Sequence, residues 1–275
     1  MSELASESSE PCSDDLKAQG MSELASESSA PCSDDLKAQG MSVEALNEFT
    51  RTYYAGLGTS VYADPVPISA QDTALVLIDI QECITKDYYV QSLTAMGVDT
   101  EPLLGVLDLM QENIQQALDN IERLLAACRE KAIAPIHVRI QAYRADGRDT
   151  GALHASAGMI YPPGSPAVGF LPQAAPKDGE VVLQKTCSGI HVGTHIDQVL
   201  RNMGIRNVIV VGFYTDQCIS TSVRDLSDLG YRVDLISDAV GAMSPERHRN
   251  AMESIQKIYA NSETTEELLN RLKEL

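Results

Sequence analysis

The sequence predicts an α/β protein, a three-layer α/β/α Rossmann-like fold with a mainly parallel five- or six-stranded sheet. Two observations lead to this prediction. From Thr73 onward, short and largely β-branched apolar runs alternate with segments whose apolar residues recur at helical spacing. The runs are continuously apolar, as in strands covered on both faces. Strands that alternate with helices pair in parallel through right-handed crossovers, so their carboxyl ends share one edge of the sheet.

Each strand is expected at one of these runs. The first, residues 74–78, is a five-residue apolar run that ends at the carboxylate of Asp79. The second, residues 136–138, follows Pro135, and turn or helix-stop signals such as Gly204 precede later strands. The later strands are expected at residues 181–183, 208–211 and 233–236, with a short edge strand at 258–261.

The longest helix is expected at residues 112–130, where apolar residues recur every three or four positions. A helix at residues 216–229 ends at Gly230, and the others are expected at 194–203, 245–258 and 264–273. Residues 141–179 form a Gly/Pro/Ala-rich connection that is longer than most loops. It is either a lid or subunit-interface loop that sets specificity, or a surface excursion.

Composition excludes several classes of function. The 275 residues include 21 Lys and Arg against 39 Asp and Glu, a net charge of -18, which argues against a nucleic-acid partner. No apolar run approaches the roughly 20 residues needed to span a bilayer, and no basic and apolar leader begins the chain. Six cysteines without a CxxC pair do not indicate a disulfide framework. We therefore expect a soluble cytoplasmic protein with no membrane partner.

The net negative charge is distributed unevenly between two regions of the chain. Residues 1–40 are a 20-residue segment and its near copy, which differ only at Glu10 and Ala30. With nine acids and two lysines they hold -7 of the charge, which leaves -11 for the remainder. A duplicated acidic disordered tail over 1–40, followed by one working domain over 41–275, is the simplest division. A duplicated leader explains the repeat better than an interaction arm, which stays an alternative.

Three chemically active side chains follow three strand ends. Asp79 follows the first strand, Lys185 the third, and Cys218 follows the fourth after a short turn. Taken one at a time, Asp79 is explained as a helix cap, Lys185 as a solvated side chain and Cys218 as a thiol in the core. Together they form a candidate site, because ligands bind at the carboxyl edge of such sheets. In the first turn of the helix that follows, Cys218 is expected to be stabilised as a thiolate by unpaired N–H groups and by Lys185.

Three segments, LVLIDIQECI, QKTCSGIHVGTHIDQVL and VVGFYTDQCISTSVRDLSDLGYRVDLISDAV, resemble the isochorismatase-like cysteine hydrolase superfamily. This superfamily includes nicotinamidases, N-carbamoylsarcosine amidohydrolases, and ureidoacrylate and biuret hydrolases. The resemblance covers about residues 70–262.

The resemblance implies a catalytic triad. Cys218 would be the nucleophile, Asp79 the general base and Lys185 the cation that holds both in position. It also implies a cis peptide bond between Phe213 and Tyr214, which would direct the Tyr214 N–H, with that of Cys218, at a developing oxyanion. The reaction would be the cleavage of a C–N bond in a small amide, N-carbamoyl compound or biuret-like ureide through a thioester.

Further expectations concern substrate and cofactors. Gln81, Arg139 and Tyr214 are candidates for binding substrate, and Tyr88 and Tyr89, within the insert 86–105, are candidates for apolar walls. Residues 136–147 lack the second histidine of metal-dependent nicotinamidases, so no metal and no organic cofactor is expected. Relatives are commonly oligomers, which implies a homodimer or homotetramer. The alternative reaction is isochorismatase-type hydrolysis of a vinyl ether with release of pyruvate, because one scaffold hosts both chemistries.

Overall fold

The computed structural model describes residues 42–56, 65 and 67–275. The predicted tail of residues 1–40 lies outside the described residues. Most of helix α3 (Val43–Gly56) falls in a separate unit of the chain that ends at Tyr53, and this helix was not predicted. Within it, the rings of Phe49 and Tyr53 stack with their centroids 6.1 Å apart.

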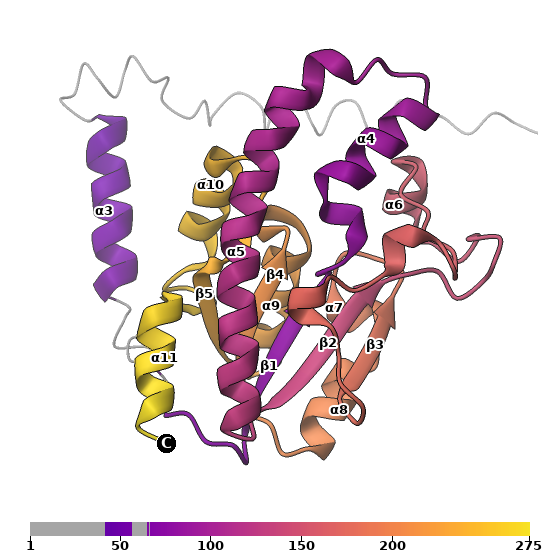
Figure 1. The fold of residues 1–275 in the computed structure, drawn as a ribbon. Coiled ribbons are helices and arrows are strands. Elements are labelled where there is room, and N and C mark those ends of the chain that lie inside the picture. Colours follow the sequence, from indigo (N-terminus) through magenta and orange to yellow (C-terminus); the bar gives the residue numbers. More distant parts are fainter. Residues whose placement is uncertain (1–41, 57–64, 66) are drawn as a thin grey trace, which may run out of the picture. The chain divides into compact units, whose positions relative to one another are not determined.

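One parallel sheet organises residues 73–263 (Figure 1). Its six strands stand in the order β3-β2-β1-β4-β5-β6, which confirms the predicted class of fold. The chain reverses its direction of strand addition between β1 and β4, and in open α/β sheets the ligand site lies at such a point. The strands are β1 (Thr73–Ile78), β2 (Ala134–Ile140), β3 (Val181–Lys185), β4 (Asn207–Phe213), β5 (Arg232–Gly241) and β6 (Asn261–Glu263).

The helices cover both faces of the sheet, as predicted (Figure 1). Helices α5 and α11 pack on one face, and α8, α9 and α10 on the other. The α-helices after β1 are α4 (Lys86–Ala95), α5 (Leu104–Glu130), α6 (Ala152–Ser156), α7 (Ile190–Gly193), α8 (Ile196–Asn202), α9 (Ser220–Asp228), α10 (Pro245–Ile255) and α11 (Thr265–Lys273).

Alternate residues of each central strand point into different cores. On β1, Leu75 and Leu77 pack towards α5, whereas Val76 and Ile78 pack towards α8 and α9. Every residue of β1 and β4 is buried, which accounts for their continuously apolar sequences. Each Val, Leu, Ile or Phe side chain buried in these two strands contributes about 1.5–3 kcal/mol.

The predicted boundaries were wrong at several places. Strand β6 begins at Asn261, after the predicted 258–261, because residues 256–260 make a turn in which the Lys257 N–H donates to the Ala260 carbonyl at 2.8 Å. The predicted helix at 216–229 is a π-helical turn, η7 (Thr215–Ile219), that leads into α9. Helix α4 was not predicted, since none of its residues is buried and its apolar residues follow no stripe.

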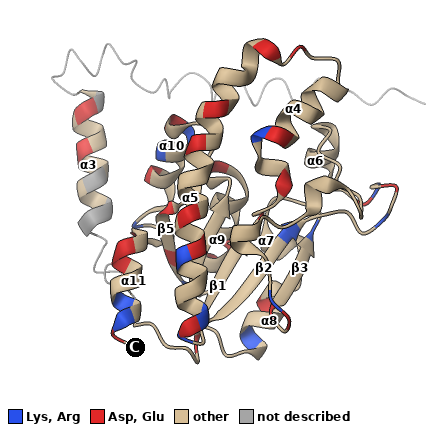
Figure 2. Ribbon diagram, in the orientation of Figure 1, with Lys and Arg blue, Asp and Glu red and all other residues tan. Residues whose placement is uncertain are grey.

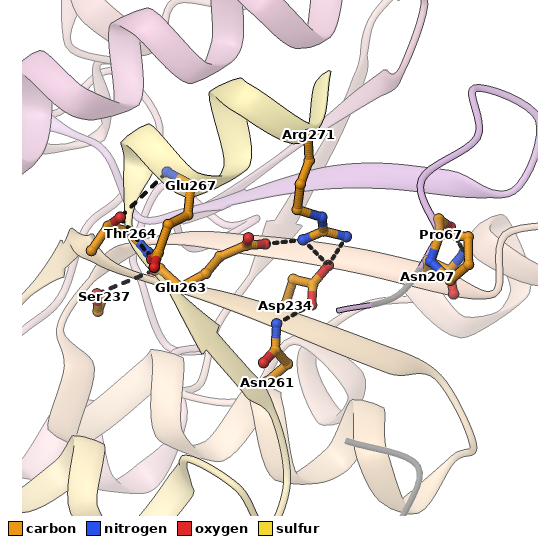
Figure 3. Close-up of polar contacts among 9 residues, drawn as sticks. All are labelled: Pro67, Asn207, Asp234, Ser237, Asn261, Glu263, Thr264, Glu267 and Arg271. Carbon is orange, nitrogen blue, oxygen red and sulfur yellow. Dashed lines mark hydrogen bonds and ion pairs between the residues drawn. The ribbon is translucent and has the colours of Figure 1, made fainter. Parts of the chain in front are cut away.

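A buried ionic cluster joins β5, β6 and α11 at the edge of the sheet (Figure 3). The Arg271 guanidinium pairs with Asp234 at 3.3 Å and with Glu263, and both carboxylates are nearly inaccessible to solvent. The Asn261 amide donates to Asp234 at 2.9 Å. Burial raises the pKa of Asp234, and burial with the neighbouring Asp234 charge raises the pKa of Glu263 to about 7. The single positive charge of Arg271 therefore does not neutralise both negative charges, those of Asp234 and Glu263.

The acidic side chains are spread over several helices, including α4, α5 and α11 (Figure 2). None of the helices in the described part of the chain is both long and apolar enough to cross a membrane.

Candidate active site

Asp79, Lys185 and Cys218 meet at the carboxyl edge of the sheet. The Lys185 Nζ lies 2.7 Å from Asp79 Oδ2 and 3.3 Å from Cys218 Sγ, and it also donates to the Cys187 carbonyl at 3.0 Å. All three side chains are buried, and Lys185 has no exposed surface. An acid, an ammonium and a thiol are therefore within contact distance of one another, away from bulk water.

The strand order explains why the cation is a lysine. Lys185 is the last residue of β3 and Asp79 follows β1, so β2 lies between them. With neighbouring strands about 4.8 Å apart, the two backbones are separated by roughly 10 Å. The long side chain of lysine crosses the end of β2 to reach the carboxylate. Asp79 itself has a φ of 54°, and its N–H donates to the Val138 carbonyl at 2.9 Å.

The segment between β4 and Cys218 has a special backbone. Gly212 has a φ of 122°, and a Cβ there would lie 2.0 Å from the Ile78 carbonyl oxygen, so only glycine fits. The peptide bond between Phe213 and Tyr214 is cis. The Ile219 N–H donates to the Tyr214 carbonyl at 3.2 Å, which brings Tyr214 and Cys218 into one turn. This turn delivers the thiol to the end of β1.

The protonation state of Cys218 differs from the sequence prediction. Burial and the Asp79 carboxylate raise the pKa of the thiol to about 12, and Lys185 opposes them only in part. Lys185 favours the thiolate, as expected, but burial and Asp79 outweigh it and leave the pKa of Cys218 raised. The helical turn that was expected to stabilise it is a π-helical turn, and desolvation outweighs the single cation. Burial disfavours charge on Lys185 as well, but Asp79 and Cys218 raise its pKa, so it stays an ammonium.

Comparison with known proteins identifies the architecture. The isochorismatase domain matches residues 73–267. The chain belongs to the isochorismatase family.

Relatives of this isochorismatase-family hydrolase include amidohydrolases. It is 24% identical over 241 residues to the ureidoacrylate amidohydrolase of Acinetobacter baylyi. This match covers 80% of this chain and 92% of that protein. It is 24% identical to the maleamate amidohydrolase of Pseudomonas putida over 66% of this chain and 91% of that one. The crystal structure of a cysteine hydrolase from Pseudomonas syringae pv. phaseolicola is similar, with a TM-score of 0.63 and 25% sequence identity. The match covers 76% of this chain and 96% of that one.

Gln81 is hydrogen-bonded to a neighbouring strand in this isochorismatase-family chain. Its side-chain Nε2 donates to the Ile140 carbonyl at 3.1 Å, and its Oε1 accepts from the Ile140 N–H at 2.7 Å. The side chain is completely buried. Its amide ties the end of β1 to the end of β2, and substrate binding by Gln81 stays a prediction.

Arg139 lies beside an aromatic ring. Its guanidinium carbon is 5.6 Å from the centroid of the Phe170 ring, on the face of β2 that also presents His137 to Phe170. Burial lowers the pKa of Arg139, and its Nε has no hydrogen-bond partner among the described residues. Substrate binding by Arg139 stays a prediction.

Other side chains beside the triad were not predicted as a group. Cys83 is buried, and burial and the Asp79 charge raise the pKa of its thiol, an effect that Lys185 opposes. The charges of the triad thus act on the Cys83 thiol. Its only sequence signal is its place four residues after Asp79. His154, from α6, is buried and has a pKa lowered by burial and by the Lys185 charge.

The long connection of residues 141–179 is fixed to the strand ends at several points. The Gly151 N–H donates to the Thr186 carbonyl at 2.8 Å, and a Cβ on Gly151 would lie 2.8 Å from the same oxygen. The Leu171 N–H donates to the Ile80 carbonyl at 3.1 Å. The connection thus covers the edge of the sheet that carries the triad. Among the residues that the structure describes, no group of three or more His, Cys, Asp and Glu side chains is arranged to hold a metal.

Proposed function

We propose that this chain is a cysteine-dependent amidohydrolase that cleaves a C–N bond of a small amide, N-carbamoyl compound or ureide. The observation that carries the proposal is the contact of the Lys185 ammonium with both Asp79, at 2.7 Å, and the Cys218 thiol, at 3.3 Å. An acid, a thiol and a fixed cation are the groups that acyl transfer through a thioester requires. The amidohydrolases among the relatives support the same reading.

The first step in this mechanism is attack by Cys218. Because the thiol is protonated at rest, its proton must leave as the sulfur attacks the carbonyl carbon. Asp79 Oδ1 is buried and has no hydrogen-bond partner among the described side chains, so it is free to accept this proton. Lys185 holds Oδ2 and keeps the ammonium charge near the developing thiolate.

The second step is collapse of the tetrahedral intermediate. We place its oxyanion against the N–H groups of Tyr214 and Cys218. Asp79 gives its proton to the departing nitrogen, the C–N bond breaks, and an acyl thioester on Cys218 remains. Water then attacks the thioester carbonyl and gives a proton to Asp79, and the sulfur leaves and is protonated again.

A panel of amides and ureides, with ammonia as the readout, tests this proposal. Cys218→Ala should abolish release, whereas Cys128→Ala, which removes a thiol from the core under α5, should leave turnover intact. Intact-mass measurement during turnover should show an acyl adduct that is absent from the Cys218→Ala protein. Turnover at the wild-type rate by Cys218→Ala would refute the assignment of Cys218 as the nucleophile.

The family also supports a second candidate reaction, hydrolysis of a vinyl ether such as isochorismate. Proton transfer from an acid to the vinyl group needs no thiol nucleophile, so the contact between Cys218 and Lys185 favours C–N cleavage. Pyruvate release from isochorismate that persists in Cys218→Ala would favour the second reaction.

We further propose a cytoplasmic homodimer or homotetramer. The described cysteines, Cys83, Cys128, Cys187 and Cys218, are free thiols, which fits a reducing compartment. Light scattering on the purified chain measures the oligomeric number.

A further inference from the structure

Helix α10 contacts the turn between β4 and α9 through two neighbouring residues. We call this turn, residues 214–219, the nucleophile turn. The Nδ1 atom of His248 lies 2.9 Å from Oγ1 of Thr215, and the Arg247 guanidinium pairs with the Asp216 carboxylate. Two adjacent residues of one helix are therefore bonded to two adjacent residues of the turn.

The hydrogen bond between Thr215 and His248 has a defined direction. Thr215 has no exposed surface, and among the residues that the structure describes His248 is the only partner of its hydroxyl. A buried hydroxyl proton without an acceptor is costly, so the Thr215 O–H donates to Nδ1. The imidazole is then neutral and carries its proton on Nε2. Burial lowers the pKa of His248, an effect that Asp216 opposes, and the lowered pKa agrees with the neutral form.

The nucleophile turn carries two groups of the proposed mechanism. It contains the Cys218 thiol, and it begins at Tyr214, whose N–H we place against the oxyanion. Its π-helical geometry, in which the Ile219 N–H donates to the Tyr214 carbonyl at 3.2 Å, is rare in proteins. Thr215 directly follows Tyr214 and lies three residues before Cys218, so a bond to Thr215 restrains both groups. A displacement of about 1 Å at such groups can slow a reaction about 100-fold.

His248 has little packing on its other side. The half-buried side chain lines a hollow between α5, β5 and α10, together with residues such as Asn113 and Asp238. A side chain that borders open space contributes less to the core than one that is packed all round. The bond to Thr215 is therefore the main described contact of the imidazole.

We propose that His248 is a positioning residue for the nucleophile: its neutral imidazole accepts the Thr215 hydroxyl and holds the nucleophile turn so that Cys218 and the Tyr214 N–H stay aligned. This inference rests on the proposed amidohydrolase function. His248 acts through Thr215 and takes no part in the bond-making steps.

Substitution of His248 tests the effect on turnover, with the best substrate of the amide and ureide panel. His248→Ala should lower kcat about ten-fold and leave KM nearly unchanged, because the aligned groups act in the transition state. His248→Asn keeps a short acceptor that does not titrate, and it should restore most of kcat. Asn250→Ala, which changes an exposed side chain of the same helix, is the control and should leave both constants unchanged. A change in KM alone, or no recovery in His248→Asn, would contradict the proposal.

A double-mutant cycle tests whether His248 acts through Thr215. Thr215→Val removes the hydroxyl and keeps the shape of the side chain, so it should lower kcat about as much as His248→Ala. In the Thr215→Val protein, His248→Ala should then have almost no further effect. Losses that multiply in the double variant would show that the two residues act independently and would overturn the inference.

Alkylation by iodoacetamide separates this inference from the proposed function, because it needs no turnover. Cys218 is buried, so it reacts only when its turn opens, whereas Cys128, in the core under α5, reports general loosening of the fold. Peptide mass spectrometry gives the rate at each thiol. In His248→Ala, alkylation of Cys218 should accelerate about ten-fold more than alkylation of Cys128.

The two thiols give outcomes that decide the matter even without a substrate. Selective acceleration at Cys218, in a protein that hydrolyses no amide or ureide of the panel, would refute the proposed function and support the hold of His248 on the turn. Equal acceleration at Cys218 and Cys128 would show a merely structural role for His248. Equal acceleration, or none, would overturn the inference whether or not the protein hydrolyses amides.

Discussion

Replacement of Glu263 by Gln is expected to stabilise the protein more at pH 8 than at pH 5.5. Glu263 is buried in the ionic cluster at the sheet edge, where Arg271 also serves Asp234 (Figure 3). Its pKa is raised from the ordinary 4.5 to about 7, first by burial and then by the Asp234 charge. Ionisation of this side chain is therefore less favourable in the folded protein than in the unfolded chain.

The sign and size of this change in stability follow from the linkage between proton binding and folding. Between pH 4.5 and about 7 the folded state binds more protons at Glu263 than the unfolded state, so the free energy of unfolding falls as the pH rises through this interval. One pKa unit is worth about 1.4 kcal/mol, so the whole interval corresponds to about 3 kcal/mol. Gln keeps an oxygen that accepts from Arg271 but does not ionise. We expect the gain at pH 8 to exceed the gain at pH 5.5 by about 2 kcal/mol, and the pH-dependent part of the gain to vanish only below pH 4.5, where Glu263 is protonated in both states.

Urea unfolding followed by circular dichroism measures this gain, at fixed protein concentration and at several pH values from 5.5 to 8. The difference between variant and wild type is the quantity to plot, because the other titrating groups cancel in it. Glu253→Gln, which changes an exposed carboxyl on α10, is the matched control for the substitution. A Glu263→Gln difference that is flat, or that grows towards low pH, would refute the reasoning.

Three further substitutions test the site. Lys185→Met should abolish turnover and lower the free energy of unfolding by about 3–5 kcal/mol in urea titrations, because Asp79 is left buried without its cation. Gly212→Ala should leave little soluble protein after expression, since the new Cβ would meet the Ile78 carbonyl oxygen at 2.0 Å. Gln81→Leu should cost about 2 kcal/mol in thermal unfolding, as the Ile140 backbone loses two buried hydrogen bonds; no loss would show that the Ile140 backbone needs neither bond.

Elements with strong local patterns were predictable. Strands β1 and β4 are buried on both faces, so each appears as a continuous apolar run. Helix α5 carries its buried residues in one stripe and differs from the prediction only in beginning earlier, at Leu104. Helix α4 and strand β6 have few buried residues, so no period marks them, and they were missed or misplaced.

The sequence predicted which residues form the candidate site better than it predicted the contacts of their side chains. Asp79, Lys185 and Cys218 each follow a strand of one parallel sheet, and parallel strands bring their carboxyl ends to a common edge. Gln81 and Arg139 have the same kind of position, yet one is bonded to the Ile140 backbone and the other lies over Phe170. The direction of a side chain depends on its neighbours in space, which strand position does not encode.

The sequence by itself determined the order of the six strands along the chain, the family, and which acid, amine and thiol arrive at one edge of the sheet. It could do so because periodicity and strand-end position are local properties of the chain. Only the tertiary structure decided that burial and Asp79 raise the pKa of the Cys218 thiol, that the Arg139 guanidinium lies over Phe170, and that the Gln81 amide is bonded to the Ile140 backbone. Those outcomes depend on desolvation and on contacts between residues far apart in the chain, and both exist only once the chain has folded.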